Sequence, residues 1–205
     1  MTTGPWWKRY QVDVPCGTAG RWTVERFTVD KSAASLERTL ALHAFSHGGR
    51  AVPAGTYTRL LHNNRLVMSD TPDEIRDLRA ILIPGRPTDR VLLHGLGLGV
   101  ALQGVLDNNP AAHVTVVEKS ADVIALVAGH YLARYGDRVK VIHDDAFTWK
   151  PARGERWDVV WHDIWDDFCE DNLAQMTRLH RRFGRRCDWQ ESWGRHRIKR
   201  MTGRR

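Results

Sequence analysis

The segment RVLLHGLGLGVALQG, residues 90–104, constrains the fold of this chain more than any other feature of its sequence. Apolar residues lead into Gly95, Gly97 and Gly99, and an apolar, helix-prone stretch follows. Glycine allows tight turns and leaves room for a ligand against the backbone. The segment therefore predicts a strand, a tight turn and a helix. Two interpretations of the glycines stay open, a turn that faces a ligand and a plain strand-to-helix turn.

From residue 88 onward, strand-like and helix-like segments alternate. The expected strands are apolar runs, as in sheets covered on both faces: RVLLHG, HVTVVEK, RVKVIHDD, RWDVVWHDI and RCDWQESW. The expected helices between them are GVALQGVLDNN, SADVIALVAGHYLARYG and DNLAQMTRLHRRFG. This alternation predicts an α/β fold with a Rossmann-like, doubly wound sheet. About five parallel strands fit, and the stretch after the fourth strand leaves no room for a sixth and seventh.

The first part of the chain is β-rich with helices. We expect strands at residues 9–14 and 21–29, a helix over 32–45 and a hairpin over 56–69 that turns at His62 to Asn64. Thr71, Pro72 and Glu74 match a capping box with proline at the first helical position. The expected organisation is a small N-terminal β-rich domain (1–84), a Rossmann-like cofactor-binding domain (85–197) and a basic tail (198–205).

Charge is unevenly distributed along the chain. Residues 178–205 carry a net charge of +9. Because the whole chain carries +7, residues 1–177 carry a net charge of −2. The tail from Ile198 has few apolar residues, and we expect it to be mobile unless an anionic partner or a second subunit holds it. A nucleic acid is one such partner, and a passive, solvated tail is the alternative.

Composition fits a protein of the cytoplasm. Hydrophobic residues make up 42% of the chain and charged residues 27%. No apolar run of membrane-spanning length and no secretory signal is present, so we expect neither membrane insertion nor export. The three cysteines, Cys16, Cys169 and Cys187, fit no metal or redox spacing and are expected to be free thiols, with no metal site.

The glycine pattern excludes two phosphate-binding classes. No Gly-Lys-Ser/Thr follows, so the segment is not a P-loop, and the spacing G-x-G-x-G differs from the dinucleotide pattern G-x-G-x-x-G. It suits a ligand whose ribose and amino-acid portion lie against the turn. Acidic residues follow the next strands at the same carboxyl edge. Glu118, about 20 residues on, can accept both ribose hydroxyls. Asp144 or Asp145, followed by the small Ala146, can accept from an adenine amino group, and Asp163 ends the fourth strand.

These motifs resemble a known family. LLHGLGLG, VVEKS, VIHDDAF and WDVVWHDIWDD are similar to the first four motifs of class I S-adenosylmethionine-dependent methyltransferases, and more narrowly to their spermidine synthase-like branch, over about residues 50–165. The resemblance implies that S-adenosyl-L-methionine is the cofactor. It also implies that the glycines lie against the methionine and ribose of this cofactor and that Glu118 binds the ribose. Asp145 and the Ala146 amide would bind adenine, and Asp163 would lie near the sulfonium.

The segment DIWDD departs from that branch. Asp163 and Asp166 keep the spacing of its D-x-x-D-P motif, but Asp167 replaces the proline, and His94 stands where an acid is usual. We therefore expect methyl transfer rather than aminopropyl transfer, with Asp163 and Asp166 as catalytic residues and a small-molecule acceptor, such as an amine. Trp161 and Trp165 flank this site, where they hold a cation or pack in the core. His162 is either a base or a structural residue.

Three other functions stay open. The chain is a polyamine aminopropyltransferase, a non-catalytic cofactor binder, or an interaction protein that acts through its basic tail. DNA base methylation gains no support, because neither an N/D-P-P-Y/F motif nor a Pro-Cys pair follows the fourth strand. An open edge of the short sheet could be covered by a second subunit, so a homodimer is also expected.

Overall fold

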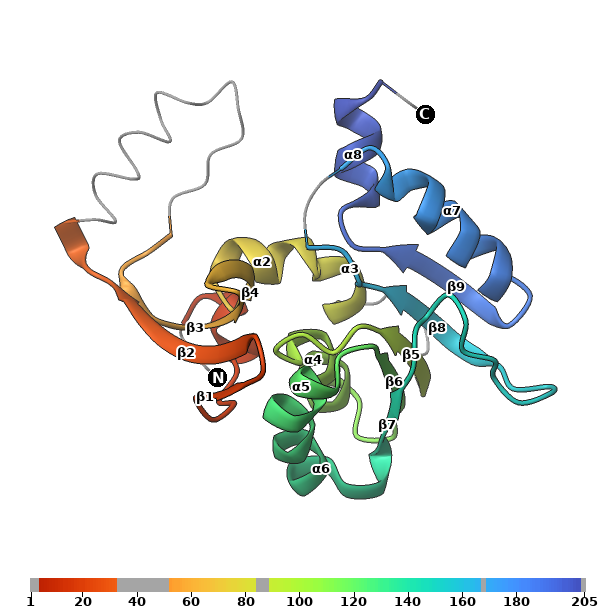
Figure 1. The fold of residues 1–205 in the computed structure, drawn as a ribbon, viewed down its shortest axis with the longest axis horizontal. Coiled ribbons are helices and arrows are strands. Elements are labelled where there is room, and N and C mark those ends of the chain that lie inside the picture. The colour runs from red at the N-terminus through yellow and green to blue at the C-terminus, as the bar shows by residue number, and fades with distance from the viewer. Residues whose placement is uncertain (1–3, 33–51, 84–88, 167–168, 204–205) are drawn as a thin grey trace.

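The structure, a computed structural model, describes residues 4–32, 52–83, 89–166 and 169–203. Its strands form two sheets, one antiparallel and one parallel (Figure 1). The helix expected over 32–45 and the predicted domain boundary at residue 84 lie almost wholly outside the described residues. The 1–84 and 85–197 division therefore stays a prediction.

The antiparallel sheet has the order β1-β2-β3-β4. Its strands are β1 (Gly17–Ala19), β2 (Trp22–Val29), β3 (Gly55–His62) and β4 (Arg65–Ser69). The predicted hairpin is confirmed, because Asn63 and Asn64 both adopt positive φ angles, 50° and 64°, as a two-residue hairpin turn requires. The strand expected over 9–14 is wrong: residues 6–10 form the 3-10 helix η1 (Trp6–Tyr10), and 11–14 have no regular structure.

Two short helices lead from this sheet toward the parallel one, α2 (Pro72–Asp77) and α3 (Arg79–Leu82). The helix begins where the sequence predicts, with Pro72 in its first turn, but the capping box does not form. The Thr71 hydroxyl lies 2.9 Å from the Ser69 hydroxyl instead of capping the helix. Glu74 is therefore free to take another role.

The parallel sheet has the order β7-β6-β5-β8-β9, and all four of its pairings are parallel. Its strands are β5 (Arg90–His94), β6 (His113–Glu118), β7 (Val139–His143), β8 (Trp157–His162) and β9 (Cys187–Ser192). This confirms the predicted Rossmann-like sheet of five strands, and the described residues contain no sixth or seventh. The order reverses direction between β5 and β8, where such sheets bind ligands.

Helices cover both faces of the parallel sheet (Figure 1). After β5 comes α4 (Val100–Asn108), and after β6 a continuous helical stretch of α5 (Ala121–Val123), the π-helical η2 (Ile124–Ala128), α6 (Gly129–Tyr135) and the 3-10 turn η3 (Gly136–Arg138). The helix α7 (Asn172–Phe183) joins β8 to β9 in the opposite direction. Because parallel crossovers are right-handed, α7 lies on the other face from α4 and α6. One hydrophobic core joins the antiparallel part to this sheet.

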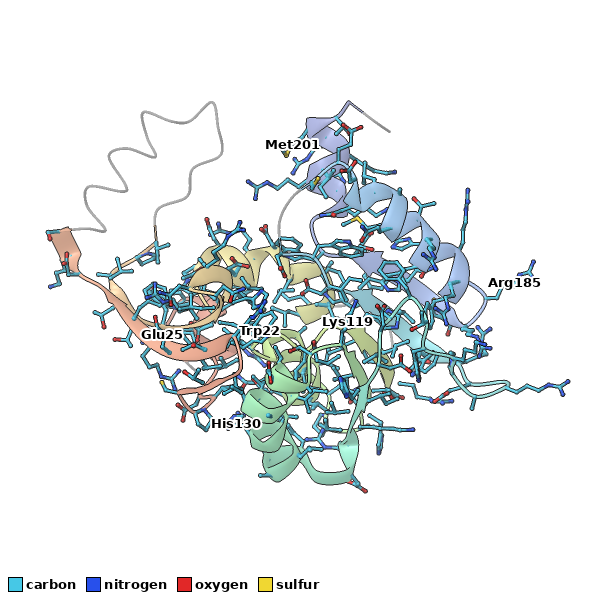
Figure 2. The ribbon with its side chains drawn as sticks, in the orientation of Figure 1. Trp22, Glu25, Lys119, His130, Arg185 and Met201 are labelled. Carbon is cyan, nitrogen blue, oxygen red and sulfur yellow. The ribbon has the colours of Figure 1, made fainter. Side chains whose placement is uncertain are left out.

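The basic tail differs from the expectation of a mobile segment. Residues 195–201 form the helix α8 (Arg195–Met201), which packs against α7. Ile198 is 2% exposed, so it anchors the helix in the core, whereas Met201 stays exposed (Figure 2). Burial of the Ile198 side chain stabilises the helix more than the low apolar content of the tail predicts. Binding of nucleic acid by this region, and a homodimer, stay predictions.

Among the helices of the described ranges, none has the length and apolar composition needed to cross a membrane.

Candidate active site

A cavity of about 440 Å³ opens at the carboxyl edge of the parallel sheet. Such a volume suits a small organic ligand. Most of the predicted site residues line it: Gly95, Gly97, Glu118, Asp145, Ala146, Asp163 and Asp166. Gly99 and Asp144 are not among its lining residues. Trp22 of β2 and Lys119, which follows β6, also line the cavity and are labelled in Figure 2. The antiparallel part therefore supplies one wall of the site.

The glycines of the β5–α4 turn are needed for close packing. Gly95 has φ 97°, and a Cβ there would lie 1.9 Å from the Asp163 carbonyl oxygen. A Cβ on Gly97 would lie 2.6 Å from Sδ of Met68, which reaches over from β4 and accepts from the Leu98 N–H at 3.4 Å. Gly99 begins α4 and lies against Tyr131. The turn therefore packs closely against β4, α6 and the segment that follows β8.

Glu118 is oriented by backbone donors on both sides. Its Oε2 accepts from the Leu96 N–H at 2.8 Å, and its Oε1 accepts from the Ser120 N–H at 2.7 Å. Each carboxylate oxygen retains a further lone pair, because an ionised carboxylate accepts about four hydrogen bonds. The carboxylate is therefore fixed at the end of β6, beside the glycine turn, and can accept from a vicinal pair of hydroxyls.

Asp145 and Asp144 have different tasks in the turn after β7. Asp145 Oδ1 accepts from the Phe147 N–H at 2.8 Å, and its Oδ2 lies 2.9 Å from Lys119 Nζ. The hydrogen bond from Lys119 lowers the pKa of Asp145, so this carboxylate is an acceptor at neutral pH. Asp144 Oδ1 accepts from the Asp145 N–H at 2.7 Å and so shapes the turn.

Arg182 of α7 holds the segment that follows Asp145. Its guanidinium donates to the carbonyl oxygens of Ala146, at 3.2 Å, and of Phe147 and Trp149. Arginine can satisfy three carbonyls at once because its donors form a rigid fork. The sequence does not distinguish Arg182 from its basic neighbours, which are Arg178, Arg181, Arg185 and Arg186.

Replacing Arg182 with methionine should loosen the segment, because three carbonyls lose donors that contribute about 1 kcal/mol each to its order. If about 1 kcal/mol of this loss reaches a ligand held by Asp145, binding of S-adenosylhomocysteine should weaken about fivefold to tenfold. Calorimetric titration with S-adenosylhomocysteine measures the effect. Arg181→Met, which removes an exposed arginine of the same helix, is the control and should bind as the wild type does. Equal affinities in the two variants would contradict the positioning role of Arg182.

Asp163 and Asp166 follow β8 and also line the cavity. Burial raises the pKa of Asp163 to about 7, an effect that the facing indole N–H of Trp161 partly offsets. Trp161 and Trp165 are 2% and 9% exposed, and both line the cavity. Trp165 donates from Nε1 to Gln175 Oε1 at 2.9 Å. Core packing, one of the two roles that the sequence left open for these tryptophans, is confirmed. The other role, holding a cation, stays a prediction. Asp167 lies outside the described residues.

His94 and His162 form a buried pair behind the site. Their Nδ1 atoms lie 2.7 Å apart, and both side chains are fully buried. Burial lowers the pKa of His162 to about 3 and that of His94 well below its usual value, so both rings are neutral. Neither ring lines the cavity. Of the two roles open for His162, the structure supports the structural one.

Several cavity residues come from the antiparallel part and were not predicted. They are Trp22, Leu60, His62, Val67, Met68, Glu74 and Leu78. His62 stacks on Trp22 with ring centroids 4.4 Å apart. The sequence could not identify these residues, because contacts between distant segments leave no local pattern.

Known proteins are similar to parts of this chain. No protein-family model matches the chain. Polyamine aminopropyltransferase 1 of Streptomyces coelicolor is 30% identical over 131 residues, which are 60% of this chain. The match spans only 24% of that curated relative's length.

Solved structures also resemble part of the chain. TrmN from Thermus thermophilus has a TM-score of 0.48 at 18% identity, over 63% of this chain and 40% of its own. Coclaurine N-methyltransferase bound to N-methylheliamine and SAH has a TM-score of 0.41 at 18% identity, over 56% and 30%. The Rossmann-like fold with an antiparallel sheet beside it follows from the chain's own strand order. In sequence, 60% of the chain is similar to polyamine aminopropyltransferase 1.

Proposed function

We propose that this protein is an S-adenosylmethionine-dependent methyltransferase that acts on an amine. One observation carries the proposal: a single cavity is lined both by residues suited to the cofactor and by residues suited to a cationic acceptor. Gly95, Gly97, Glu118, Asp145 and Ala146 form the first group. Asp163 and Asp166, with Trp161, Trp165 and Trp193, form the second.

The first group fits the cofactor's three parts. Gly95 and Gly97 line the cavity beside Glu118 and would lie against the methionine and ribose. Glu118 can accept from the ribose hydroxyls, and Asp145 with the Ala146 N–H can bind adenine. These roles need acceptors that are ionised and already oriented. Backbone donors orient Glu118, and the lowered pKa of Asp145 keeps it ionised.

The second group suits an amine because carboxylates and aromatic faces both attract cations. S-adenosylmethionine, when bound, supplies a methyl group whose bond electrons leave with the sulfur as the acceptor nitrogen forms the new bond. The protein's task is to place that nitrogen and to take its proton. Asp163, with a pKa of about 7, is suited to accept a proton near neutral pH.

Aminopropyl transfer is the second candidate, and the similarity to polyamine aminopropyltransferase 1 favours it. The replacement of the motif's proline by Asp167 favours methyl transfer instead. Incubation with methyl-labelled S-adenosylmethionine and a panel of primary amines and matched alcohols separates the reactions, with decarboxylated cofactor and 1,4-diaminobutane in parallel. We expect labelled amine and no aminopropylated product. Aminopropylation at the faster rate would reverse the order, and transfer to neither would contradict both.

Glu118→Ala should reduce affinity for S-adenosylhomocysteine about 10- to 100-fold, since hydrogen bonds to a charged group contribute about 1.5–3 kcal/mol. Calorimetric titration of both proteins measures this change. Asp137→Ala, which removes an exposed carboxylate outside the cavity, should leave the affinity unchanged. Wild-type affinity in Glu118→Ala would show that the ribose is held elsewhere.

A further inference from the structure

Glu74 is an acidic residue of the antiparallel part that reaches the acceptor end of the cavity. It lies on α2, where its neighbour Ile75 is 0% exposed and packed in the core. Glu74 and Leu78, which lie four residues apart and so on the same side of this helical segment, both line the cavity. The capping role that its spacing predicted is not used.

The start of α2 is held in place by Asp70, which is 1% exposed. Asp70 Oδ1 accepts from the Thr58 N–H at 2.7 Å, and Oδ2 accepts from the Val12 N–H at 3.0 Å. The chain therefore leaves β4 in a defined direction, and the Ile75 N–H donates to the Thr71 carbonyl at 3.0 Å to form the first helical turn. The position of Glu74 follows from buried hydrogen bonds of the fold.

Glu74 and Asp163 face the same cavity, and among the described residues neither carboxylate forms an ion pair. The positive charge of Arg197 acts on Glu74, but it offsets only part of the rise in the pKa of that carboxyl. The neighbouring acids are balanced, because Asp77 lies 3.8 Å from Arg197 and Asp73 lies 2.7 Å from Arg76. Two carboxyl groups in one cavity repel each other when both are ionised, so a bound cation would relieve that repulsion.

A second feature of the cavity also favours an ionised Asp163. The indole N–H of Trp161 is buried and makes no well-aligned hydrogen bond among the described residues, yet it faces Asp163 and lowers the pKa of that carboxyl. Trp161 is 2% exposed and lines the cavity beside Asp163. A bound cation would favour the ionised carboxylate further, because opposite charges favour the charged form.

We propose that Glu74 and Asp163 together hold the acceptor as an ammonium ion, and that Glu74 selects amines over neutral acceptors. The inference rests on the proposed function and deepens it, since it assigns a substrate class to the cavity. Trp161, Trp165 and Trp193 add aromatic faces around the same space. Glu74 is a binding residue in this arrangement, while Asp163 both binds the amine and receives its proton.

Protonation of the free protein gives the proposal a distinctive signature. Burial, followed by the charges of Asp163, Asp77 and Asp73, raises the pKa of Glu74 to about 8, and Arg197 opposes this. The pKa of Asp163 is raised to about 7. At about pH 7 the pair thus holds protons that an ammonium ion would displace. Amine affinity should rise as pH increases from about 6 to about 8, while aliphatic amines stay protonated.

Direct binding of 1,4-diaminobutane, with its neutral isostere 1,4-butanediol as comparison, tests the proposal on the full chain without cofactor. Titration at about pH 7 in two buffers of different ionisation enthalpy reports both affinity and protons released. We expect the wild type to prefer the diamine and to release about 0.5 to 1 proton per amine bound. Glu74→Gln should bind the diamine at least about tenfold more weakly and release fewer protons.

Three controls keep the result interpretable. Asp73→Asn removes a carboxylate of the same helix that does not line the cavity, and it should bind as the wild type does. Glu74→Asp retains the charge and should recover part of the affinity and the proton release, which a merely structural defect would not. Affinity for S-adenosylhomocysteine should be unchanged in all three variants.

The outcomes separate this inference from the proposed function. Unchanged diamine affinity and proton release in Glu74→Gln would overturn the role of Glu74, even if methyl transfer occurred. Equal binding of diol and diamine by the wild type would overturn the assignment of an ammonium substrate. Failure of S-adenosylhomocysteine to bind the wild type would instead contradict the proposed function itself.

Discussion

Asp163→Asn should lower turnover of the best amine acceptor about 100- to 10,000-fold, the range expected when a general base is lost. The amide retains the size of the carboxyl group but cannot take a proton. Affinity for S-adenosylhomocysteine should stay within about twofold of the wild type, because the ribose and adenine contacts are assigned to Glu118 and Asp145 on other strands. The effect should therefore appear in kcat and not in cofactor binding.

The dependence of kcat on pH tests the role of Asp163 as a base more directly. Burial raises the pKa of Asp163 to about 7, and the ionised form is the base, so wild-type kcat should rise with pH through this region and then level off. The residual rate of Asp163→Asn should lack that step. Asp188→Asn, which removes an exposed carboxylate paired with Arg156 at 3.0 Å, should behave as the wild type. Loss of cofactor affinity in Asp163→Asn would place this residue in the cofactor site.

The parallel sheet could be predicted from sequence because its signals are local. Each strand is a short apolar run, the helices between them have the expected length, and handedness rules leave few ways to connect them. The hairpin at Asn63 and Asn64 was equally local, since two asparagines tolerate positive φ. The strand expected over 9–14 failed because Val12 and Val14 are apolar for another reason: both are buried in the common core without joining a sheet.

In the candidate site, the sequence predicts the residues that directly follow the parallel strands but not those that other segments contribute. Glu118, Asp145 and Asp163 follow β6, β7 and β8, and parallel strands bring their ends to one edge. Which of Asp144 and Asp145 lines the cavity depends on the hydrogen bonds of a single turn, and the sequence cannot distinguish them. Glu74 could not be recognised, because its spacing from Thr71 matches a capping box and its approach to Asp163 depends on the packing of two separate parts.

The requirement for glycine at position 95 comes mainly from packing and less from space for a ligand. The sequence suggested that Gly95 leaves space for a ligand, and it does line the cavity. Its strongest constraint, however, is the Asp163 carbonyl, which a Cβ would approach to 1.9 Å. The Gly95 N–H donates to Val117 at 2.9 Å, and the Asp163 N–H donates to His94 at 2.8 Å. Backbone hydrogen bonds thus fix the β5–α4 turn and the segment after β8. Neither segment can move aside without breaking one of these hydrogen bonds.

Gly95→Ala should accordingly destabilise the protein by about 2–5 kcal/mol, which combines the strain of a left-handed alanine with overpacking against backbone. For a chain of this size the melting temperature should fall by roughly 5–20 °C. The folded fraction should also lose activity, because the new methyl group displaces the segment that carries Asp163. Thermal unfolding followed by circular dichroism measures the first effect, and the label-transfer assay at low temperature measures the second.

Gly129→Ala is the matched control for this substitution. Gly129 lies in the same fold at φ −57° and ψ −37°, and a Cβ there would meet nothing within 4 Å. Alanine in an unobstructed helical position should stabilise the protein by about 0.5–1 kcal/mol. The two glycine-to-alanine changes should thus have opposite signs, since one removes backbone freedom from the unfolded chain and the other adds a clash to the native state. Equal stability of Gly95→Ala and the wild type would mean that the β5–α4 turn and the segment after β8 are not packed against each other, and the placement of Asp163 in the cavity would fail with it.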